Sequence, residues 1–219
     1  MNKKEVSLIC SIIINVVIVI LEIIALIIHY GSIGNGIAIQ YYTIDSNVLA
    51  LVSSLLFVIY LFFDKKIPKW LKIFKYITTV SLTITLFVVL LILLPMSNFN
   101  YSGLLFSNVM LCHHLLCPIL GIITFIFFDD IGDFTTKDSI LSLGLTYIYS
   151  AITITLNLTG DLIGPYPFLM ILDNSILESI FYFVIIYGLS YLISFTLRTL
   201  RYKIKKGEKN GKKSKNRKN

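Results

Sequence analysis

The chain has 219 residues, of which 56% are hydrophobic and 14% are charged, and its mean hydropathy is +0.83. A water-soluble domain of this length cannot bury so much apolar surface, so the composition excludes a soluble globular protein. It indicates a chain that is surrounded mainly by lipid. The net charge of +7 then depends on where the Lys and Arg residues lie along the chain.

Six hydrophobic runs are long enough to cross a hydrocarbon core of about 30 Å, which takes about 20 helical residues. The bilayer interior offers no water to the backbone, so each run is predicted to be an α-helix. The runs cover residues 6–30, 39–63, 77–94, 104–128, 139–158 and 175–197. The sequence therefore predicts an all-α polytopic membrane protein, with one six-helix transmembrane domain over residues 1–205. The first run is longer than the apolar core of a signal peptide and is expected to remain as a helix.

The basic residues predict an orientation. If the N-terminus lies inside, all 19 Lys and Arg residues fall on the inner side and the three outer loops hold none. Both termini are therefore expected to be cytoplasmic. Residues 206–219 form a basic tail that is predicted to be disordered. This tail is expected to contact anionic inner-leaflet lipids, at about 1 kcal/mol per basic residue, and no nucleic-acid partner is expected.

Polar residues fall in stripes within the predicted helices. In the first helix Ser11, Asn15, Glu22 and His29 recur at intervals of four, seven and seven, which places them on one face. Hydroxyl stripes elsewhere are expected to form hydrogen bonds across helices or back to their own turn. These are Thr78, Ser81 and Thr85 in the third helix, and Ser142, Thr146, Ser150, Thr153 and Asn157 in the fifth. Intramembrane charge faces the bundle interior, so Glu22 is either a structural hydrogen-bonded acid or a pocket residue.

Most other polar residues converge on the outer half of the predicted bundle, where we expect a pocket. His113 and His114 lie about 14 Å into the fourth helix, measured from its outer end. The remaining residues at this level are Thr43, Asp45, Asn47, Asp161, Tyr166, Asp173 and Glu178. The predicted substrate-binding residues are Glu22, Asp45, Asn47, Asn108 and Tyr166.

The stretch Cys112-His113-His114-Leu-Leu-Cys117 raises the possibility of a metal site. His113 and Cys117 share a helix face, but His114 is rotated by about 100° and Cys112 by about 140° from Cys117. One helix therefore cannot direct all four groups inward, and neither a metal nor another cofactor is predicted. The three cysteines also provide no disulfide framework.

Nucleophilic catalysis is the other chemistry that these residues suggest. It requires a hydroxyl or thiol, a base within hydrogen-bonding reach, and a group that orients the base. Thr43 with His113 or His114 meets the first two requirements, because both come from outer-half positions. Cys112 and Cys117 remain alternative nucleophiles.

Three motifs carry a resemblance to a known family. The stretch Tyr-Tyr-Thr43-Ile-Asp-Ser-Asn-Val-Leu, a later helix with His before Pro118, and Thr-Gly-Asp-Leu-Ile-Gly-Pro-Tyr166-Pro-Phe-Leu resemble the androgen-induced-gene family of six-pass membrane proteins. That family includes the androgen-dependent TFPI-regulating protein and small bacterial membrane proteins. The resemblance covers most of the chain in topology, but only about thirty residues in motif. The sequence Asp-Ser-Asn after the hydroxyl is closer to the bacterial branch.

The resemblance implies a threonine hydrolase that cleaves fatty acid esters. It identifies Thr43 as the nucleophile, while the spacing to Pro118 selects His113 in the animal pattern and His114 in the bacterial pattern, which has one residue less. The prediction is therefore a lipid-ester hydrolase that acts on a fatty-acyl ester from the outer half of the bilayer. The alternatives are a substrate-binding subunit of a vitamin transporter, or a lipid acyltransferase that uses a cysteine. The first of these alternatives is weakened because the first helix holds only one alanine, Ala25.

Overall fold

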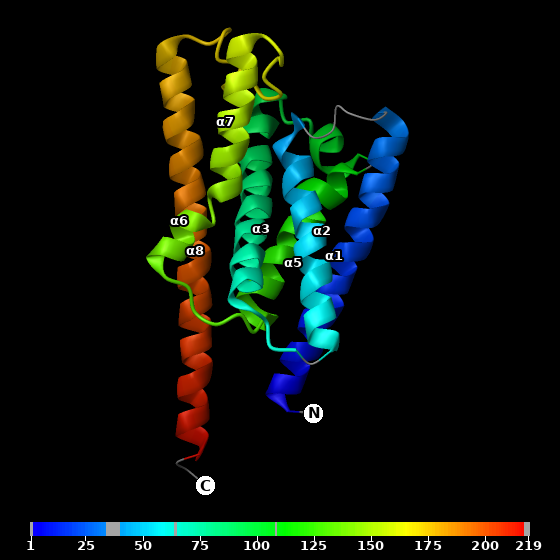
Figure 1. Ribbon diagram of the computed structural model, residues 1–219, viewed down its shortest axis with the longest axis vertical. Helices are drawn as coiled ribbons and strands as arrows, with labels where there is room; N and C mark the ends of the chain where they lie inside the picture. The colour runs from blue at the N-terminus through cyan, green and yellow to red at the C-terminus, as the bar shows by residue number, and fades with distance from the viewer. Residues whose placement is uncertain (1, 34–39, 64, 108, 217–219) are drawn as a thin grey trace.

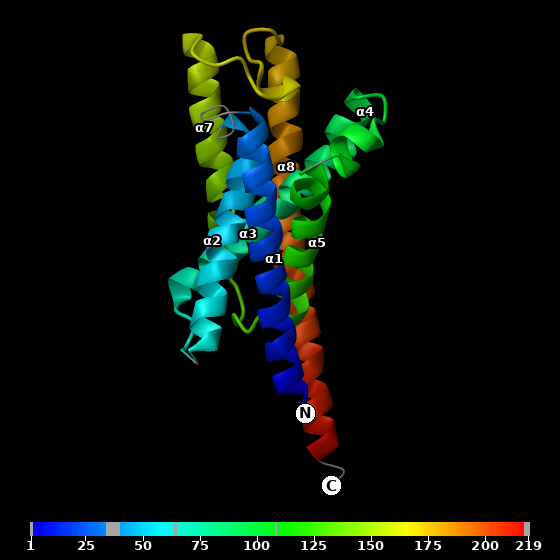
Figure 2. The same cartoon turned by 90° about the vertical axis from the view of Figure 1, so that its right-hand side faces the viewer.

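The computed structural model describes residues 2–33, 40–63, 65–107 and 109–216, and these ranges contain helices and no strand. The long helices run alongside one another as an elongated bundle, and the two ends of the chain lie at the same end of it (Figures 1 and 2). These helices are α1 (Lys3–Ile33), α2 (Tyr42–Phe62), α3 (Lys69–Val88), α7 (Gly144–Thr159) and α8 (Ile176–Asn216).

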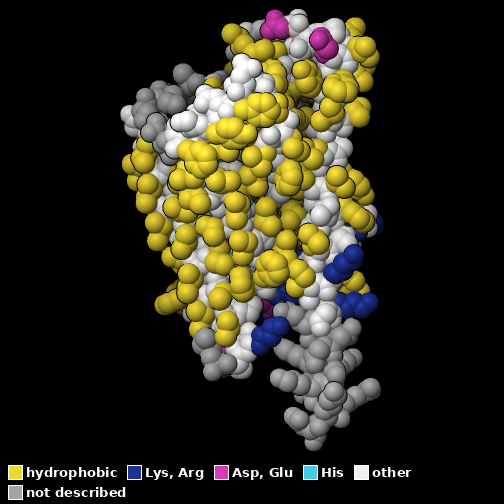
Figure 3. Space-filling view, turned by 180° about the vertical axis from the view of Figure 1, so that it is seen from behind, with side chains coloured by type: hydrophobic (Ala, Val, Ile, Leu, Met, Phe, Trp, Pro, Cys, Tyr) yellow, Lys and Arg dark blue, Asp and Glu magenta, His cyan; other side chains and the backbone are white. Residues whose placement is uncertain are grey.

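Five helical stretches of the described residues are long and apolar enough to cross a membrane. They are Lys3–Gly31, Tyr42–Phe62, Lys69–Met96, Thr136–Thr159 and Ile176–Gly207. Apolar side chains cover most of the bundle face in Figure 3, with Lys and Arg gathered toward the end that holds the termini. Exposed Ile27 and Phe62, at 69% and 76%, are typical of side chains that contact lipid. The chain is therefore a multi-pass membrane protein.

The predicted helix at 104–128 differs from the structure at its beginning. A π-helical turn, η3 (Ser102–Phe106), ends where the backbone becomes extended at Ser107. The Ser107 hydroxyl donates back to the Gly103 carbonyl at 2.6 Å, within the end of this turn. The apolar helix that follows covers only Cys112–Phe128 and is shorter than the five long stretches. It consists of η4 (Cys112–Leu116), α5 (Cys117–Ile123) and η5 (Thr124–Phe128).

Other boundaries also shift. α3 begins at Lys69, eight residues before the predicted start, and continues through the π-turn η2 (Val89–Leu93) into α4 (Leu94–Met96). Figure 2 shows that α4 leans away from α7 and α8. The predicted helix at 139–158 is two helices, α6 (Thr136–Leu141) and α7, separated by a turn. α8 continues as a helix to Asn216, through most of the segment that was expected to be a disordered tail.

The predicted polar stripes all face the interior. Ser11, Asn15, Glu22 and His29 of α1 are between 0% and 6% exposed. The hydroxyl stripes of α3 and α7 are buried as well, and several of their members bond across helices, as predicted. One example is Thr146, whose hydroxyl lies 2.9 Å from the Tyr42 hydroxyl.

Arg201 of α8 anchors the end of the short helix. Its guanidinium donates to the carbonyls of Phe125, Asp129 and Gly132, and only 2% of the side chain is exposed. Carbonyls at a helix C-terminus have no partner within the helix, and a cation there satisfies them. Arg201 therefore holds the turn after η5 against α8.

We predict that Arg201→Gln destabilises the protein by about 3–5 kcal/mol, because it removes the charge that satisfies buried carbonyls. Arg198→Gln is the matched control, since Arg198 makes an exposed hydrogen bond to Thr136 and its loss is expected to cost less than about 1 kcal/mol. Unfolding in detergent micelles measures both variants, and equal losses would contradict the anchoring role.

Candidate functional site

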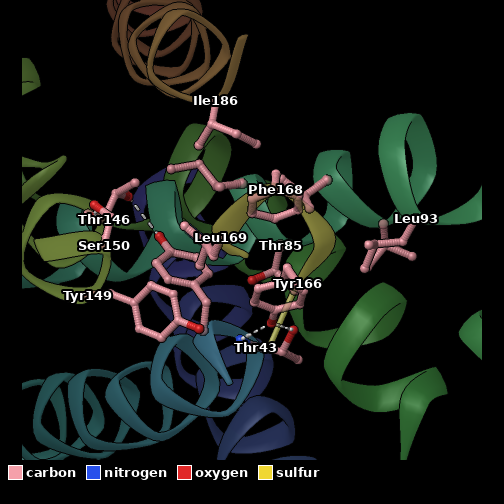
Figure 4. Close-up of a pocket in the computed structure, with 14 residues that line it drawn as sticks. Thr43, Thr85, Leu93, Thr146, Tyr149, Ser150, Tyr166, Phe168, Leu169 and Ile186 are labelled. Atoms are coloured by element: carbon pink, nitrogen blue, oxygen red, sulfur yellow. Dashed lines mark hydrogen bonds between the residues drawn. The ribbon is translucent and has the colours of Figure 1, made fainter. Parts of the chain in front are cut away.

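An apolar pocket opens between α2, α3, α7 and α8, closed on one side by the 3₁₀ turn η6 (Pro167–Leu169). Its empty volume is about 490 Å³, which includes the open space at its mouth. Thr43, Thr85 and the other Ser, Thr and Tyr residues of the lining contribute hydroxyl groups to its wall (Figure 4). The full lining is Tyr42, Thr43, Ile84, Thr85, Val88, Val89, Leu93, Thr146, Tyr149, Ser150, Tyr166, Phe168, Leu169 and Ile186.

Thr43 and Tyr166 meet at the wall of this pocket. The Thr43 hydroxyl and backbone N–H both lie 3.4 Å from the Tyr166 hydroxyl, and Figure 4 shows the two side chains in contact. Tyr166 is held by stacking on Phe168, with ring centroids 5.1 Å apart. Burial raises the pKa of the Tyr166 phenol, so it remains a neutral donor at physiological pH.

The loop that carries Tyr166 returns on itself at Gly164. A Cβ atom at this position would lie 2.5 Å from the Leu169 carbonyl oxygen, so only glycine allows the close approach. The conformation of the Thr-Gly to Tyr-Pro-Phe-Leu motif thus places the Tyr166 hydroxyl over the first turn of α2.

Of the two histidines, His113 is the one that pairs with a carboxyl group. Its Nε2 lies 3.3 Å from Oε2 of Glu22, and both side chains are fully buried. The two groups are within ion-pair distance but are not aligned as a hydrogen bond, so both His113 nitrogens and both Glu22 oxygens lack hydrogen-bond partners among the described residues. His29 lies beside them, with its ring centroid 6.3 Å from that of His113.

Asn47 links the threonine turn to the histidine turn. Its amide Nδ2 donates to the Thr43 carbonyl at 2.7 Å and to the His113 carbonyl at 3.3 Å. Both backbones are therefore held by one buried side chain, which lies one turn after Thr43 on the same face of α2. Within the described residues, no hydrogen bond joins the Thr43 hydroxyl itself to His113.

The remaining predicted site residues lie elsewhere. His114 points to η3, where its Nδ1 is 2.6 Å from the Leu104 carbonyl oxygen. Asp45 is half-buried and does not line the pocket, and Asn108 lies outside the described residues. The acidic residues expected near the pocket are exposed instead, and Glu178 caps its own helix through Ser175.

The two thiols of the short helix lie near Glu22. Cys117 is fully buried, while Cys112 is half-buried, and both lie close enough to Glu22 to interact electrostatically. Among the residues that the structure describes, no group of three His, Cys, Asp or Glu side chains is arranged to hold a metal ion.

A second group of buried polar side chains was not predicted as a cluster from the sequence. We call it the basic-end cluster: Ser11, Asn15, Ser54, Lys75, Thr124 and Asp129. Lys75 donates to Asn15 and to the Ser54 hydroxyl at 2.9 Å, although it was counted only as an orientation signal. Asp129 accepts from Ser11 at 2.6 Å, from Thr124 at 2.8 Å and from Asn15 at 3.2 Å. The position of Lys75, three residues before Thr78 of the buried stripe, was the available signal.

We compared the chain with known proteins at the level of family, sequence and structure. No protein-family model, no curated protein and no solved structure matches the chain. The resemblance carried by the motifs therefore remains a prediction, and the function has to be argued from the site itself.

We predict that Glu22 and His113 are energetically coupled. In a double-mutant cycle of Glu22→Gln and His113→Asn, unfolding in detergent should give an interaction energy of about 0.5–3 kcal/mol, as for residues in contact. The control cycle replaces His113→Asn with His114→Asn and should be additive within about 0.5 kcal/mol. Coupling of Glu22 to His114 instead would overturn the assignment of the pair.

Proposed function

We propose that the protein is a membrane-embedded hydrolase of a fatty-acyl ester, with Thr43 as nucleophile and His113 as base. The single observation that carries this proposal is the Asn47 amide, which ties the Thr43 turn at the pocket wall to the backbone of the histidine that faces Glu22. A hydroxyl, a base and an acid that orients the base are the three parts of a nucleophilic site.

The pocket supports an acyl substrate because its walls are almost entirely apolar. Ile84, Val88, Val89 and Leu93 form one side and Ile186 lies opposite. A hydrocarbon chain buries its surface there at about 25 cal/mol per Å², while few polar groups are available to recognise a charged ligand. Thr43 and Tyr166 supply the polar contacts that an ester carbonyl needs.

In the proposed reaction the Thr43 oxygen bonds to the ester carbonyl carbon as its proton passes to Nδ1 of His113. Glu22 faces Nε2 and stabilises the imidazolium. The C–O bond then breaks, the leaving alcohol takes the proton, and an acyl-threonine remains. Water attacks this acyl group through the same base, and the released Thr43 oxygen recovers the proton. The Tyr166 hydroxyl donates to the oxyanion in both halves of the reaction.

Substrate binding has to bring Thr43 and His113 together, since the free protein has no hydrogen bond between them. Catalytic hydrogen bonds commonly tighten only in the substrate complex. Asn47 donates to both backbones, so a small shift of its amide moves the two turns relative to each other.

The finer topology belongs to the same proposal. We infer six membrane crossings, with the short helix at 112–128 as the fourth, and both termini on the cytoplasmic face of a bacterial plasma membrane. Two facts support this inference: the chain ends lie at the same end of the bundle, and the described Lys and Arg residues cluster there (Figure 3). Membrane lipids are then the immediate partners, with anionic lipids near the basic end of α8.

The test is labelling of membranes that express the protein with a lipophilic fluorophosphonate, which reacts with activated hydroxyl groups. We expect Thr43→Ala to abolish labelling and His113→Ala to reduce its rate about 10²-fold or more, whereas His114→Ala should keep most of it. The matched control is Thr155→Ala, an exposed threonine on α7.

Labelling that survives Thr43→Ala would overturn the threonine mechanism. If the label then depends on Cys112 or Cys117, the cysteine transferase replaces it. A complete lack of labelling with a co-purifying vitamin would favour the transport alternative.

A second prediction concerns Tyr166→Phe, which removes the proposed oxyanion donor. We expect kcat for ester hydrolysis to fall by about 10²–10³-fold with KM nearly unchanged, as when an oxyanion-hole donor is lost. Tyr187→Phe is the matched control, because its hydroxyl bonds the pocket residue Ser150 at 2.7 Å without reaching Thr43. An increase in KM alone would assign Tyr166 to binding rather than to the transition state.

A further inference from the structure

The buried face of α1 carries polar residues across nearly the whole thickness of a membrane. From Ser11 to His29 the helix rises about 27 Å, against about 30 Å for the hydrocarbon core. The four polar residues of this face are at most 6% exposed, and Ile18 and Ala25 are its other buried members. The proposed hydrolytic site uses only Glu22 of these four residues, so it does not account for the rest of the row.

At one end of the row lies the basic-end cluster. Its Asp129 carboxylate has three donors on Oδ1, but its buried Oδ2 has no hydrogen-bond partner among the described residues. Lys75 and Asp129 interact electrostatically through the bridging Asn15, although they share no direct hydrogen bond. The cluster thus holds one buried acid, Asp129, and one buried base, Lys75.

Two turns further along α1, Glu22 faces His113, and His29 continues the row toward the opposite end. Five buried atoms have no hydrogen-bond partner in the part of the chain that the structure describes: Glu22 Oε1 and Oε2, His113 Nδ1 and Nε2, and His29 Nε2. The other titratable groups that face this cluster are the thiols of Cys112 and Cys117 and the ring of His114, which interacts with His113.

Unpaired buried acids and imidazoles are costly when their only role is structural, because a buried polar group without a partner loses about 1–3 kcal/mol. Acids and histidines that recur inside membrane helices are typical of proton relays. The spacing here suits that role. Glu22 Oε2 and His113 Nε2 are 3.3 Å apart, and the ring centroids of His113 and His29 are 6.3 Å apart, a separation that a single water molecule is able to span.

We propose that the α1 row conducts protons between the two membrane faces, in addition to the proposed hydrolysis, with which it shares Glu22 and His113. A proton enters through Lys75 and Asp129 and passes to the Glu22 carboxylate. It moves from Oε2 of Glu22 to Nε2 of His113, which leaves the carboxylate and forms an imidazolium. His113 then releases a proton from Nδ1 toward His29, whose imidazole passes it to the opposite surface.

Ile18 is the buried apolar residue of α1 that lies between the two clusters. It is 1% exposed and lies on the same face as Asn15 and Glu22, midway between them. Water has to enter this layer transiently for a proton to cross it, so Ile18 sets the rate. Replacing Ile18 with a polar residue of smaller size should therefore increase conduction.

The experiment reconstitutes the full chain in phosphatidylethanolamine–phosphatidylglycerol liposomes that contain a pH-sensitive dye. Valinomycin and a potassium gradient then drive proton movement. We expect the wild-type rate to exceed that of protein-free liposomes at least tenfold. Glu22→Gln should return it to the protein-free rate, and the exposed Glu178→Gln, the matched control, should keep it. Thr43→Ala separates the two activities, because it removes the proposed nucleophile and leaves the relay intact.

Loss of conduction in Glu22→Gln could also result from unfolding, so Ile18→Ser provides a second test in which the expected change is a gain. It should raise the rate several-fold, and adding Glu22→Gln to it should abolish the gain. A wild-type rate equal to that of protein-free liposomes would overturn the proposal. So would a gain in Ile18→Ser that survives Glu22→Gln, because the proton would then follow another path.

Discussion

The constraint on which the structure depends is the burial of α1 polar groups inside a bundle that lipid surrounds. Asn15 and Glu22 are fully buried where no water is available to satisfy them. Asn15 accepts a hydrogen bond from Lys75 and donates one to Asp129. Glu22 lies within ion-pair distance of His113. These contacts join α1 to α3 and to both ends of the short helix, so the polar face of one helix positions the elements around it.

Much of the helix content was predictable from the sequence, because hydrophobic length is a strong signal for lipid contact. The stripe of Ser11, Asn15, Glu22 and His29 was predictable too, since its period follows directly from helix geometry. The break at Ser107 was not, because the hydrophobic run continues on both sides of it and no proline marks the position where the backbone becomes extended. Lys75 was misread for a related reason: its charge is typical of a membrane boundary, and only its packing shows that it is buried.

The candidate site was predictable in composition but not in pairing. Thr43, Tyr166 and His113 all came from the motifs, yet their neighbours depend on tertiary contacts. Sequence spacing could not show that the Tyr166 hydroxyl contacts Thr43, because Tyr166 lies in the loop between α7 and α8 and the path of a loop is not specified by helix periodicity. The role of Asn47 likewise depends on where η4 packs against α2, which no local pattern specifies.

The π-turn η4 has a consequence for how related chains are to be aligned. A π-turn holds one residue more than the α-helical turn it replaces, as an insertion that the helix absorbs without a loop. Here that residue lies between His113 and Pro118. A chain with an ordinary turn at this place would present the same imidazole to Glu22 from one position nearer its proline. Alignment without a gap would then match that histidine to His114, and an equivalent residue would be scored as a substitution.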